Sequence, residues 1–159
     1  MRIAGIVRDS IVDGPGIRDV IFMQGCSHHC KGCHNTQTWN PNGGEERLSG
    51  SILRELSDSQ NDITISGGEP LAQWKPLLRL LHHIRYRTDK RVWLYTGHTV
   101  DLSQQCYHVL ARYVDVIVDG KFVEELKDPD LLFRGSSNQR LVDIKKSVKA
   151  KKIIEWEEC

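Results

Sequence analysis

The segment DITISGG, residues 62–68, is a short run of β-branched residues that ends in two glycines. This pattern is typical of a buried strand followed by a tight turn. Three further runs have the same form, namely RDVIFMQG at 18–25, RVWLYTG at 91–97 and DVIVDG at 115–120. Helix-period segments lie between them, such as LLRLLHHI at 77–84. The chain therefore alternates between strands and helices.

This alternation predicts an α/β fold with a mostly parallel sheet and right-handed crossovers. A closed eight-stranded barrel needs roughly 200 residues or more, and this chain has 159. We therefore expect an incomplete parallel (βα) barrel in one domain that spans residues 1–159. A further strand is expected at RLVDI, residues 140–144, and a short helix at 49–59, with Ser49 or Ser51 as its N-cap.

The composition narrows the class of protein. The net charge of +1 provides no general attraction to nucleic acid or membranes, and no window approaches the length of a bilayer span. The five cysteines are an odd number, and three of them are crowded into one short segment. This arrangement favours metal binding in a reducing compartment over a secreted disulfide framework. We therefore expect a cytoplasmic protein that binds neither nucleic acid nor membranes.

Each predicted strand ends in residues suited to chemistry. The cysteine segment follows the first strand, SGGEP the second, YTGHT the third and DGK the fourth. In parallel α/β folds, ligands bind beyond the carboxyl ends of the strands. The four segments are therefore expected to meet at one edge of the sheet.

The segment GCSHHCKGCHN, residues 25–35, places Cys26, Cys30 and Cys33 in a C-x3-C-x2-C pattern. A [4Fe-4S] cluster is commonly held by four thiolates, so three leave one iron free to take the amine and carboxylate of a substrate. Cys106 lies on an apolar helix face and Cys159 is the last residue, so neither is the expected fourth ligand. The alternative is a zinc site that adds one imidazole to the thiolates, from His28, His29 or His34.

The cysteine pattern followed by GGEP resembles the radical S-adenosylmethionine superfamily. Within it, the segments DGPGIR at 13–18, CHN at 33–35, YTG at 95–97 and RGSSNQR at 134–140 resemble the anaerobic ribonucleoside-triphosphate reductase activating proteins. The resemblance covers nearly the whole chain. It implies a glycyl-radical-enzyme activase that cleaves S-adenosyl-L-methionine reductively at its cluster, and whose 5′-deoxyadenosyl radical takes a hydrogen atom from a glycine of the reductase.

The same resemblance assigns roles to individual residues. Glu69 would accept a hydrogen bond from the ammonium of the cofactor, His34 would lie beside its adenine, and Asp119 to Lys121 would lie near its ribose and carboxylate. The family's electron donors imply a flavodoxin- or thioredoxin-type partner. The residues expected to contact the cofactor are Gly32, His34, Gly67, Gly68, Glu69, Thr96, Asp119, Gly120 and Lys121.

Other interpretations of the same residues stay open at this point. The chain could activate another glycyl-radical enzyme, such as pyruvate formate-lyase, or serve as an iron–sulfur electron carrier that uses no S-adenosylmethionine. Gly-Gly-Glu-Pro and Asp-Gly-Lys after strands are also ordinary turn sequences. The partial barrel leaves one side open, so we expect a rim that includes DGPGIR and residues 134–140 to contact a large protein partner.

Overall fold

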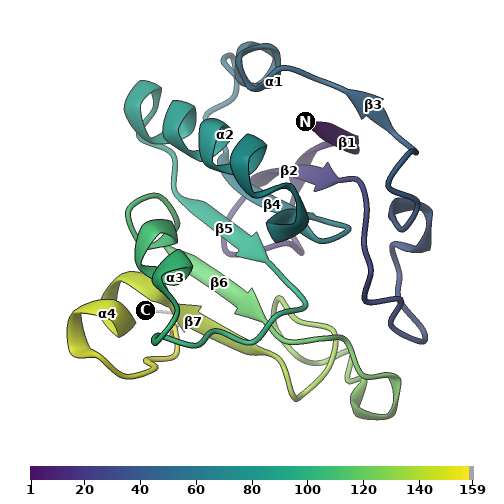
Figure 1. Cartoon of the computed structure of the whole chain (residues 1–159), viewed down its shortest axis with the longest axis vertical. Helices are drawn as coiled ribbons and strands as arrows, with labels where there is room; N and C mark the ends of the chain where they lie inside the picture. The colour runs from purple at the N-terminus through teal and green to yellow at the C-terminus, as the bar shows by residue number, and fades with distance from the viewer. Residues whose placement is uncertain (158–159) are drawn as a thin grey trace.

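The computed structural model describes residues 1–157 and shows a mixed α/β fold built on one open sheet of seven strands. The strands lie in the order β3-β1-β2-β4-β5-β6-β7 (Figure 1). The strands are β1 (Arg2–Ser10), β2 (Arg18–Met23), β3 (Glu45–Glu46), β4 (Asp62–Gly67), β5 (Val92–Tyr95), β6 (Val116–Asp119) and β7 (Arg140–Asp143). The helices are α1 (Ser49–Glu55), α2 (Trp74–Arg87), α3 (Gln105–Leu110) and α4 (Ile144–Ala150).

The four central strands, β2, β4, β5 and β6, pair in parallel, as the alternation of strands and helices predicts. The outer strands are antiparallel: β1 pairs with β2, β3 with β1, and β7 with β6. The sheet is therefore parallel at its centre and antiparallel at both sides, and it does not close on itself. The parallel centre is the part that brings several strand ends to one edge.

The two faces of the sheet are covered differently. Alternate residues of the strands, such as Ile63, Leu94 and Ile117, pack with residues from all four helices in one core. The intervening residues face the other side, where Trp93, Val118 and Leu141 form a smaller cluster without a helix. The helix-free face is thus partly covered by loops and by the C-terminal segment.

The structure corrects some local expectations. Strand β1 was not predicted, because it lies near the edge of the sheet and its residues are mostly half-buried or exposed. Helix α1 ends at Glu55, earlier than expected, and its N-cap is Leu48 rather than Ser49 or Ser51. The expected strand at 140–144 is confirmed as β7. Cys159 lies outside the described residues.

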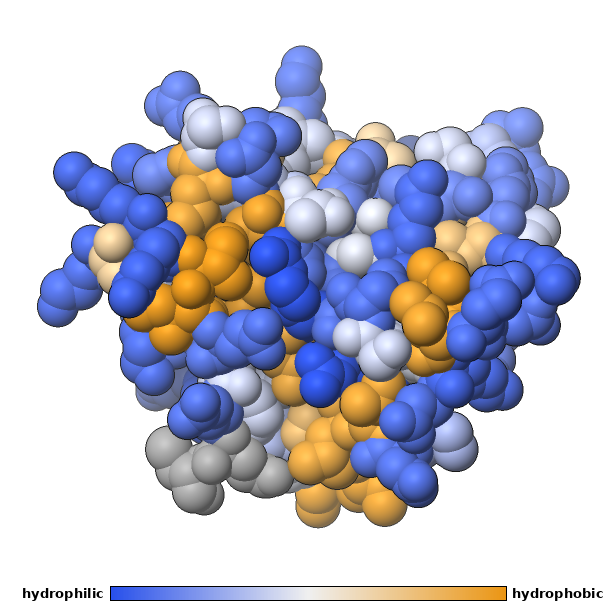
Figure 2. Space-filling view, turned by 90° about the horizontal axis from the view of Figure 1, so that it is seen from below, coloured by the Kyte–Doolittle hydropathy of each residue, from blue (hydrophilic) through white to orange (hydrophobic). Residues whose placement is uncertain are grey.

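The face shown in Figure 2 alternates between hydrophilic residues and separate apolar patches. None of the described helices has both the length and the apolar character that crossing a bilayer would require. The large hydrophobic side chains that are exposed are Val7, Ile11, Val12, Ile17, Leu48, Tyr86, Leu126 and Leu132.

Candidate functional site

The loops after β2, β4, β5 and β6 lie next to one another because these four strands are parallel neighbours. They carry the cysteine segment, the Gly-Gly-Glu turn, the Thr-Gly segment and the Asp-Gly-Lys segment. The expected meeting of these four motifs at one edge of the sheet is therefore what the structure shows.

The cysteine segment forms a compact loop after β2. Cys26, Cys30 and Cys33 are half-buried free thiols. The backbone N–H of Cys26 donates to the carbonyl of Trp39 at 3.1 Å, and that of Cys33 donates to the carbonyl of Cys30 at 3.1 Å. These bonds fix both ends of the loop and leave the three sulfur atoms on it as candidate ligands.

The environment of the thiols favours a bound cation. Partial burial and the two neighbouring thiols raise the pKa of Cys30, although the backbone N–H of Phe122 opposes this effect. Three thiolates this close repel one another, and a positively charged metal centre relieves that repulsion. The donor set of three sulfur atoms fits a [4Fe-4S] cluster with one iron open to another ligand.

The imidazoles that a zinc site would use point to different partners. His28 places its Nε2 atom 2.9 Å from Glu69 Oε2. The His29 ring packs edge-on against Trp39, with ring centroids 4.8 Å apart, and the centroid of His34 lies 6.0 Å from that of Phe122. The contact between His34 and Phe122 keeps this ring next to the last cysteine, where the resemblance places an adenine neighbour.

The Gly-Gly-Glu turn is bound directly to the cysteine loop. Gly68 N–H donates to the carbonyl of Met23 and Glu69 N–H to that of Gly25, both at 2.8 Å. Gly67 has a φ of +99°, and a side chain on Gly68 would place its Cβ 2.3 Å from the carbonyl oxygen of Gly25. Glycine is therefore required at 67 and 68 for the turn to approach the end of β2 so closely.

Glu69 is almost completely buried, with 2% of its surface exposed, and its carboxylate accepts hydrogen bonds from fixed donors. Oε1 accepts from Leu71 N–H at 2.9 Å and from the Thr96 hydroxyl at 2.9 Å. Oε2 accepts from Gly97 N–H at 2.9 Å and lies at the same distance from His28 Nε2. Glu69 and Thr96, which were both expected to contact the cofactor, are thus hydrogen-bonded to each other. His28, which was named only as a possible zinc ligand, lies against the same carboxylate.

Asp119, at the end of β6, has its carboxylate occupied by protein groups. It accepts from Val100 N–H at 2.7 Å and forms a two-pronged ion pair with Arg140. Gly120 donates its N–H to the carbonyl of His98 at 3.0 Å, and the carbonyl of Lys121 accepts from the Asn138 side chain. In this structure Asp119 holds the loops together.

Gly32 is part of the cysteine loop, and Lys121 lies near it. The charge of Lys121 acts to lower the pKa of Cys30, so the ammonium lies near the thiols. A Cβ on Gly32 would come within 2.8 Å of Glu124 Oε1, and Glu124 itself pairs with Lys31 at 2.9 Å. Glu124 therefore packs against the cysteine loop at Gly32.

Two cavities lie on either side of the cysteine loop. The first, of about 720 Å³, is lined by Cys26, Trp39 and Gln73 among others. The second, of about 700 Å³, is lined by Cys33 and by side chains on the helix-free face, such as Ser66 and Tyr95. Its rim includes residues 11–13, 127–129 and 131–135.

Several residues of the second cavity were not identified from the sequence. Tyr95 donates its hydroxyl to the carbonyl of Phe133 at 2.7 Å, and burial raises its pKa. The alternation along β5 puts Tyr95 on the same face as Trp93, so its direction was predictable from the strand pattern. The contact with Phe133 joins residues 38 positions apart and had no local signal.

Comparison with known proteins agrees with this geometry. A family model described as "4Fe-4S single cluster domain" matches residues 12–142. Three relatives are called anaerobic ribonucleoside-triphosphate reductase-activating proteins. The one from Escherichia coli K12 is 41% identical, over 81% of this chain and 90% of its own length. The one from Vibrio cholerae is 38% identical, over 81% and 89%. The one from Enterobacteria phage T4 is 36% identical, over 82% and 86%.

The family model covers the cysteine loop, the Gly-Gly-Glu turn and the strands that bring them together. The chain belongs to the family of anaerobic ribonucleoside-triphosphate reductase-activating proteins and contains a 4Fe-4S domain.

Proposed function

We propose that this protein activates an anaerobic ribonucleoside-triphosphate reductase by generating a glycyl radical in it. The observation that carries the proposal is the hydrogen-bonded junction between the cysteine loop and the Gly-Gly-Glu turn. A [4Fe-4S] cluster on Cys26, Cys30 and Cys33 would supply one electron for the reductive cleavage of S-adenosyl-L-methionine. The chain's own residues hold these groups side by side and shape the space around them.

The position of Glu69 supports its role with the amino group of the cofactor. Its carboxylate is held rigidly by Leu71, Thr96 and Gly97, so its direction is set before any ligand binds. His28 Nε2 uses the remaining position on Oε2. An incoming ammonium would take over this position, so the His28 ring would have to move away from Glu69 when the cofactor binds.

The other residues expected to contact the cofactor fall into two groups, according to what each side chain contacts in the structure. His34 and Lys121 lie close to the cysteine loop and are proposed to contact the adenosine part or the carboxylate of the cofactor. Asp119 is proposed to act indirectly, because Arg140 and Val100 already occupy its carboxylate. Gly120 then sets the direction of the Lys121 loop through its bond to His98.

The second cavity supports a protein substrate. It begins at Cys33, extends over the helix-free face and has exposed apolar side chains, Ile11, Val12 and Leu132, at its rim. We propose that the reductase inserts its glycine loop here and so excludes water from the radical. In this proposal the single domain is an incomplete radical-SAM barrel, and the partner covers the side that the open sheet leaves uncovered.

Anaerobic reconstitution with iron and sulfide tests the proposal. The reconstituted protein should cleave S-adenosylmethionine to 5′-deoxyadenosine when reduced, and it should produce a glycyl doublet in electron paramagnetic resonance when the reductase is added. A partner in which the glycine is replaced by alanine is the control and should give no doublet. A doublet formed with pyruvate formate-lyase but not with the reductase would assign the protein to another glycyl-radical enzyme.

The same assay distinguishes an enzyme that cleaves S-adenosylmethionine from an iron–sulfur protein that only carries electrons. A protein that takes up iron but does not cleave S-adenosylmethionine under any reductant would be an electron carrier instead. Replacing a chemical reductant by a flavodoxin or by a thioredoxin system tests which class of electron donor the chain accepts.

A further inference from the structure

The side chains of His28, Glu69 and His98 form a cluster that the cofactor-binding role of Glu69 does not explain. They come from the loops after β2, β4 and β5, and each offers one ligand atom within 4.8 Å of the other two. Two imidazole nitrogens and one carboxylate oxygen are a common ligand set for zinc, with an open position for a water or another ligand.

Two of the three ligands are held in place. The Glu69 carboxylate is fixed by backbone N–H groups and by Thr96. The His28 ring lies against the backbone of Gly97, where a Cβ would come within 2.4 Å of it. The absence of a side chain at 97 therefore allows the imidazole to reach Glu69.

The third ligand, His98, lies next to His28 and has a side chain that can rotate. The His98 ring is packed edge-on against that of His28, with centroids 4.8 Å apart and an interplanar angle of 69°. His98 is exposed, and its ring makes no hydrogen bond within residues 1–157. Its backbone is anchored, because its N–H donates to Thr96 Oγ1 at 3.1 Å and its carbonyl accepts from Gly120.

The distances require only a small adjustment. His28 Nε2 and Glu69 Oε2 are 2.9 Å apart. Ligand atoms at zinc distances of about 2.0–2.1 Å in a tetrahedron are separated by about 3.3 Å. His28 and Glu69 would therefore need to move by a few tenths of an ångström, and His98, whose ligand atom lies within 4.8 Å of the other two, would approach by a rotation of its exposed ring.

We infer that His28, Glu69 and His98 form a second metal site, which binds a divalent transition-metal ion of the zinc class. His28 coordinates through Nε2 and carries its proton on Nδ1, while Glu69 coordinates through Oε2. The ion lies outside the three thiolates. Because the ion uses the oxygen that the proposed function gives to the ammonium of S-adenosylmethionine, the two ligands compete, and zinc inhibits cofactor binding. The competition rests on the proposed function, whereas the metal site does not.

Metal binding is measured first, without S-adenosylmethionine. The protein with its cluster assembled is dialysed against Zn²⁺, and zinc and iron are counted by elemental analysis. We expect one zinc per chain at unchanged iron content, and at least about tenfold weaker zinc binding in His98→Ala. His82→Ala is the matched control, because His82 is also an exposed histidine but lies on α2; its zinc binding should equal that of the unmodified protein.

Competition is measured second, by titrating S-adenosylmethionine with and without saturating Zn²⁺. At a zinc concentration about ten times the zinc Kd of the unmodified protein, zinc should weaken cofactor binding about tenfold in the unmodified protein and in His82→Ala, and about twofold or less in His98→Ala. Equal zinc uptake by His98→Ala, or zinc uptake that expels iron, would overturn the metal site. One zinc per chain with unchanged cofactor affinity would overturn the competition and leave the site. Absence of cofactor cleavage in zinc-free protein would contradict the proposed function and not the metal site.

Discussion

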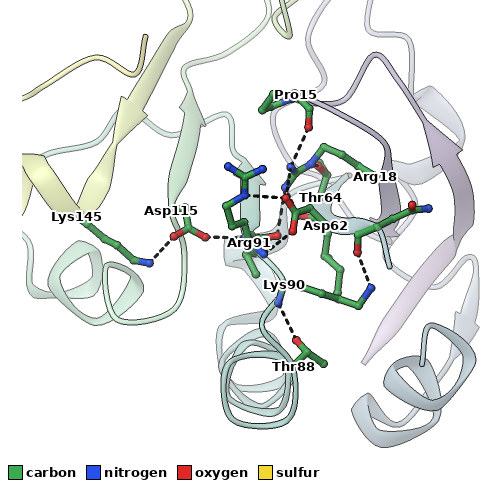
Figure 3. A network of polar contacts seen from close by, with 12 residues as sticks. Pro15, Arg18, Asp62, Thr64, Thr88, Lys90, Arg91, Asp115 and Lys145 are labelled. Atoms are coloured by element: carbon green, nitrogen blue, oxygen red, sulfur yellow. Dashed lines mark hydrogen bonds and ion pairs between the residues drawn. The ribbon is translucent and has the colours of Figure 1, made fainter. Parts of the chain in front are cut away.

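The parallel strands begin at one edge of the sheet, the amino edge, and end at the other, the carboxyl edge. Both edges contain buried charged groups, yet they are built differently. At the amino edge, Arg18 is fully buried, and it donates to the Thr64 hydroxyl and to the carbonyl of Ile63, both at 2.7 Å (Figure 3). Its guanidinium also lies 3.6 Å from Asp62 and 5.5 Å from the centre of the Trp93 ring. Burial lowers the pKa of Arg18 to about 10.

At the carboxyl edge, the polar groups lie on loops beside two cavities. The thiols of Cys30 and Cys33 accept hydrogen bonds from backbone N–H groups of these loops, whereas Arg18 is enclosed by acceptors on adjacent strands. A buried charge therefore does not identify a binding site by itself. Groups that converge beside open space and can still bind a ligand do identify one, and the carboxyl edge has such groups next to both cavities.

Removal of a cluster ligand should have the largest effect. Cys26→Ala, Cys30→Ala or Cys33→Ala should each abolish the four-iron cluster, because the loop has no fourth thiol to replace the one that is lost. Iron content and the visible spectrum after anaerobic reconstitution measure this. A full complement of iron in any of the three variants would remove that cysteine from the site.

Substitutions at the amino edge should change the stability of the fold and leave cluster binding unchanged. Arg18→Met leaves Thr64 and the carbonyl of Ile63 without their donor and should lower the free energy of unfolding by about 3 kcal/mol, as when one partner of a buried charged pair is removed. Folded Arg18→Met should still assemble its cluster. Asp58→Asn, which breaks an exposed ion pair with Arg8, is the control and should lower the free energy of unfolding much less.

Denaturant titration and iron content together check the Arg18 prediction. Equal stability losses in Arg18→Met and Asp58→Asn would contradict the view that the amino edge is a structural network. Loss of iron from folded Arg18→Met would show instead that the two edges are coupled.

Substitution of the carboxylate should have an intermediate effect at the carboxyl edge. Glu69→Gln keeps the shape of the side chain and an acceptor oxygen, but it removes the charge that would bind an ammonium. The iron content should be unchanged, and S-adenosylmethionine should bind more weakly by about 1.5–3 kcal/mol. Equilibrium binding to the reconstituted protein measures this, and an unchanged affinity would exclude Glu69 from the cofactor site.

The smallest effect is expected for the cysteine outside the loop. Cys106 is half-buried and packs against the main core from α3. Cys106→Ala should keep the cluster and lower the free energy of unfolding by about 1 kcal/mol or less, because little apolar surface is removed. A decrease in iron content in this variant would show that Cys106 contributes to cluster assembly.

The central strands and the order of the functional segments were predictable from local sequence. The runs at 62–68, 91–97 and 115–120 are apolar, and each ends at a glycine. Strand β1 was missed because an edge strand with mostly half-buried residues lacks a continuous apolar pattern. The direction of α4 and the pairing of β7 against β6 were also not predictable, because both depend on contacts with distant strands.

Within the candidate site, residue types were predictable but their partners were not. Nothing near His28 in the sequence indicates that its ring reaches Glu69, 41 positions away. Asp119 was expected near the ribose and carboxylate of the cofactor, but nothing in the sequence indicated that Arg140, 21 positions away, binds its carboxylate. Both pairings join loops from different strands, and no periodicity within one strand or helix carries that information.

The sequence alone determined which atoms are available for chemistry: three thiols in one short loop, a carboxylate after two glycines, and four strands whose following loops carry these groups. These properties are local, since spacing and periodicity act over a few residues. Only the tertiary structure decided which of these groups meet. The approach of the Gly68 backbone to Gly25 and of His28 to Glu69 depends on the packing of β2, β4 and β5, in which each contact requires all the others to be in place.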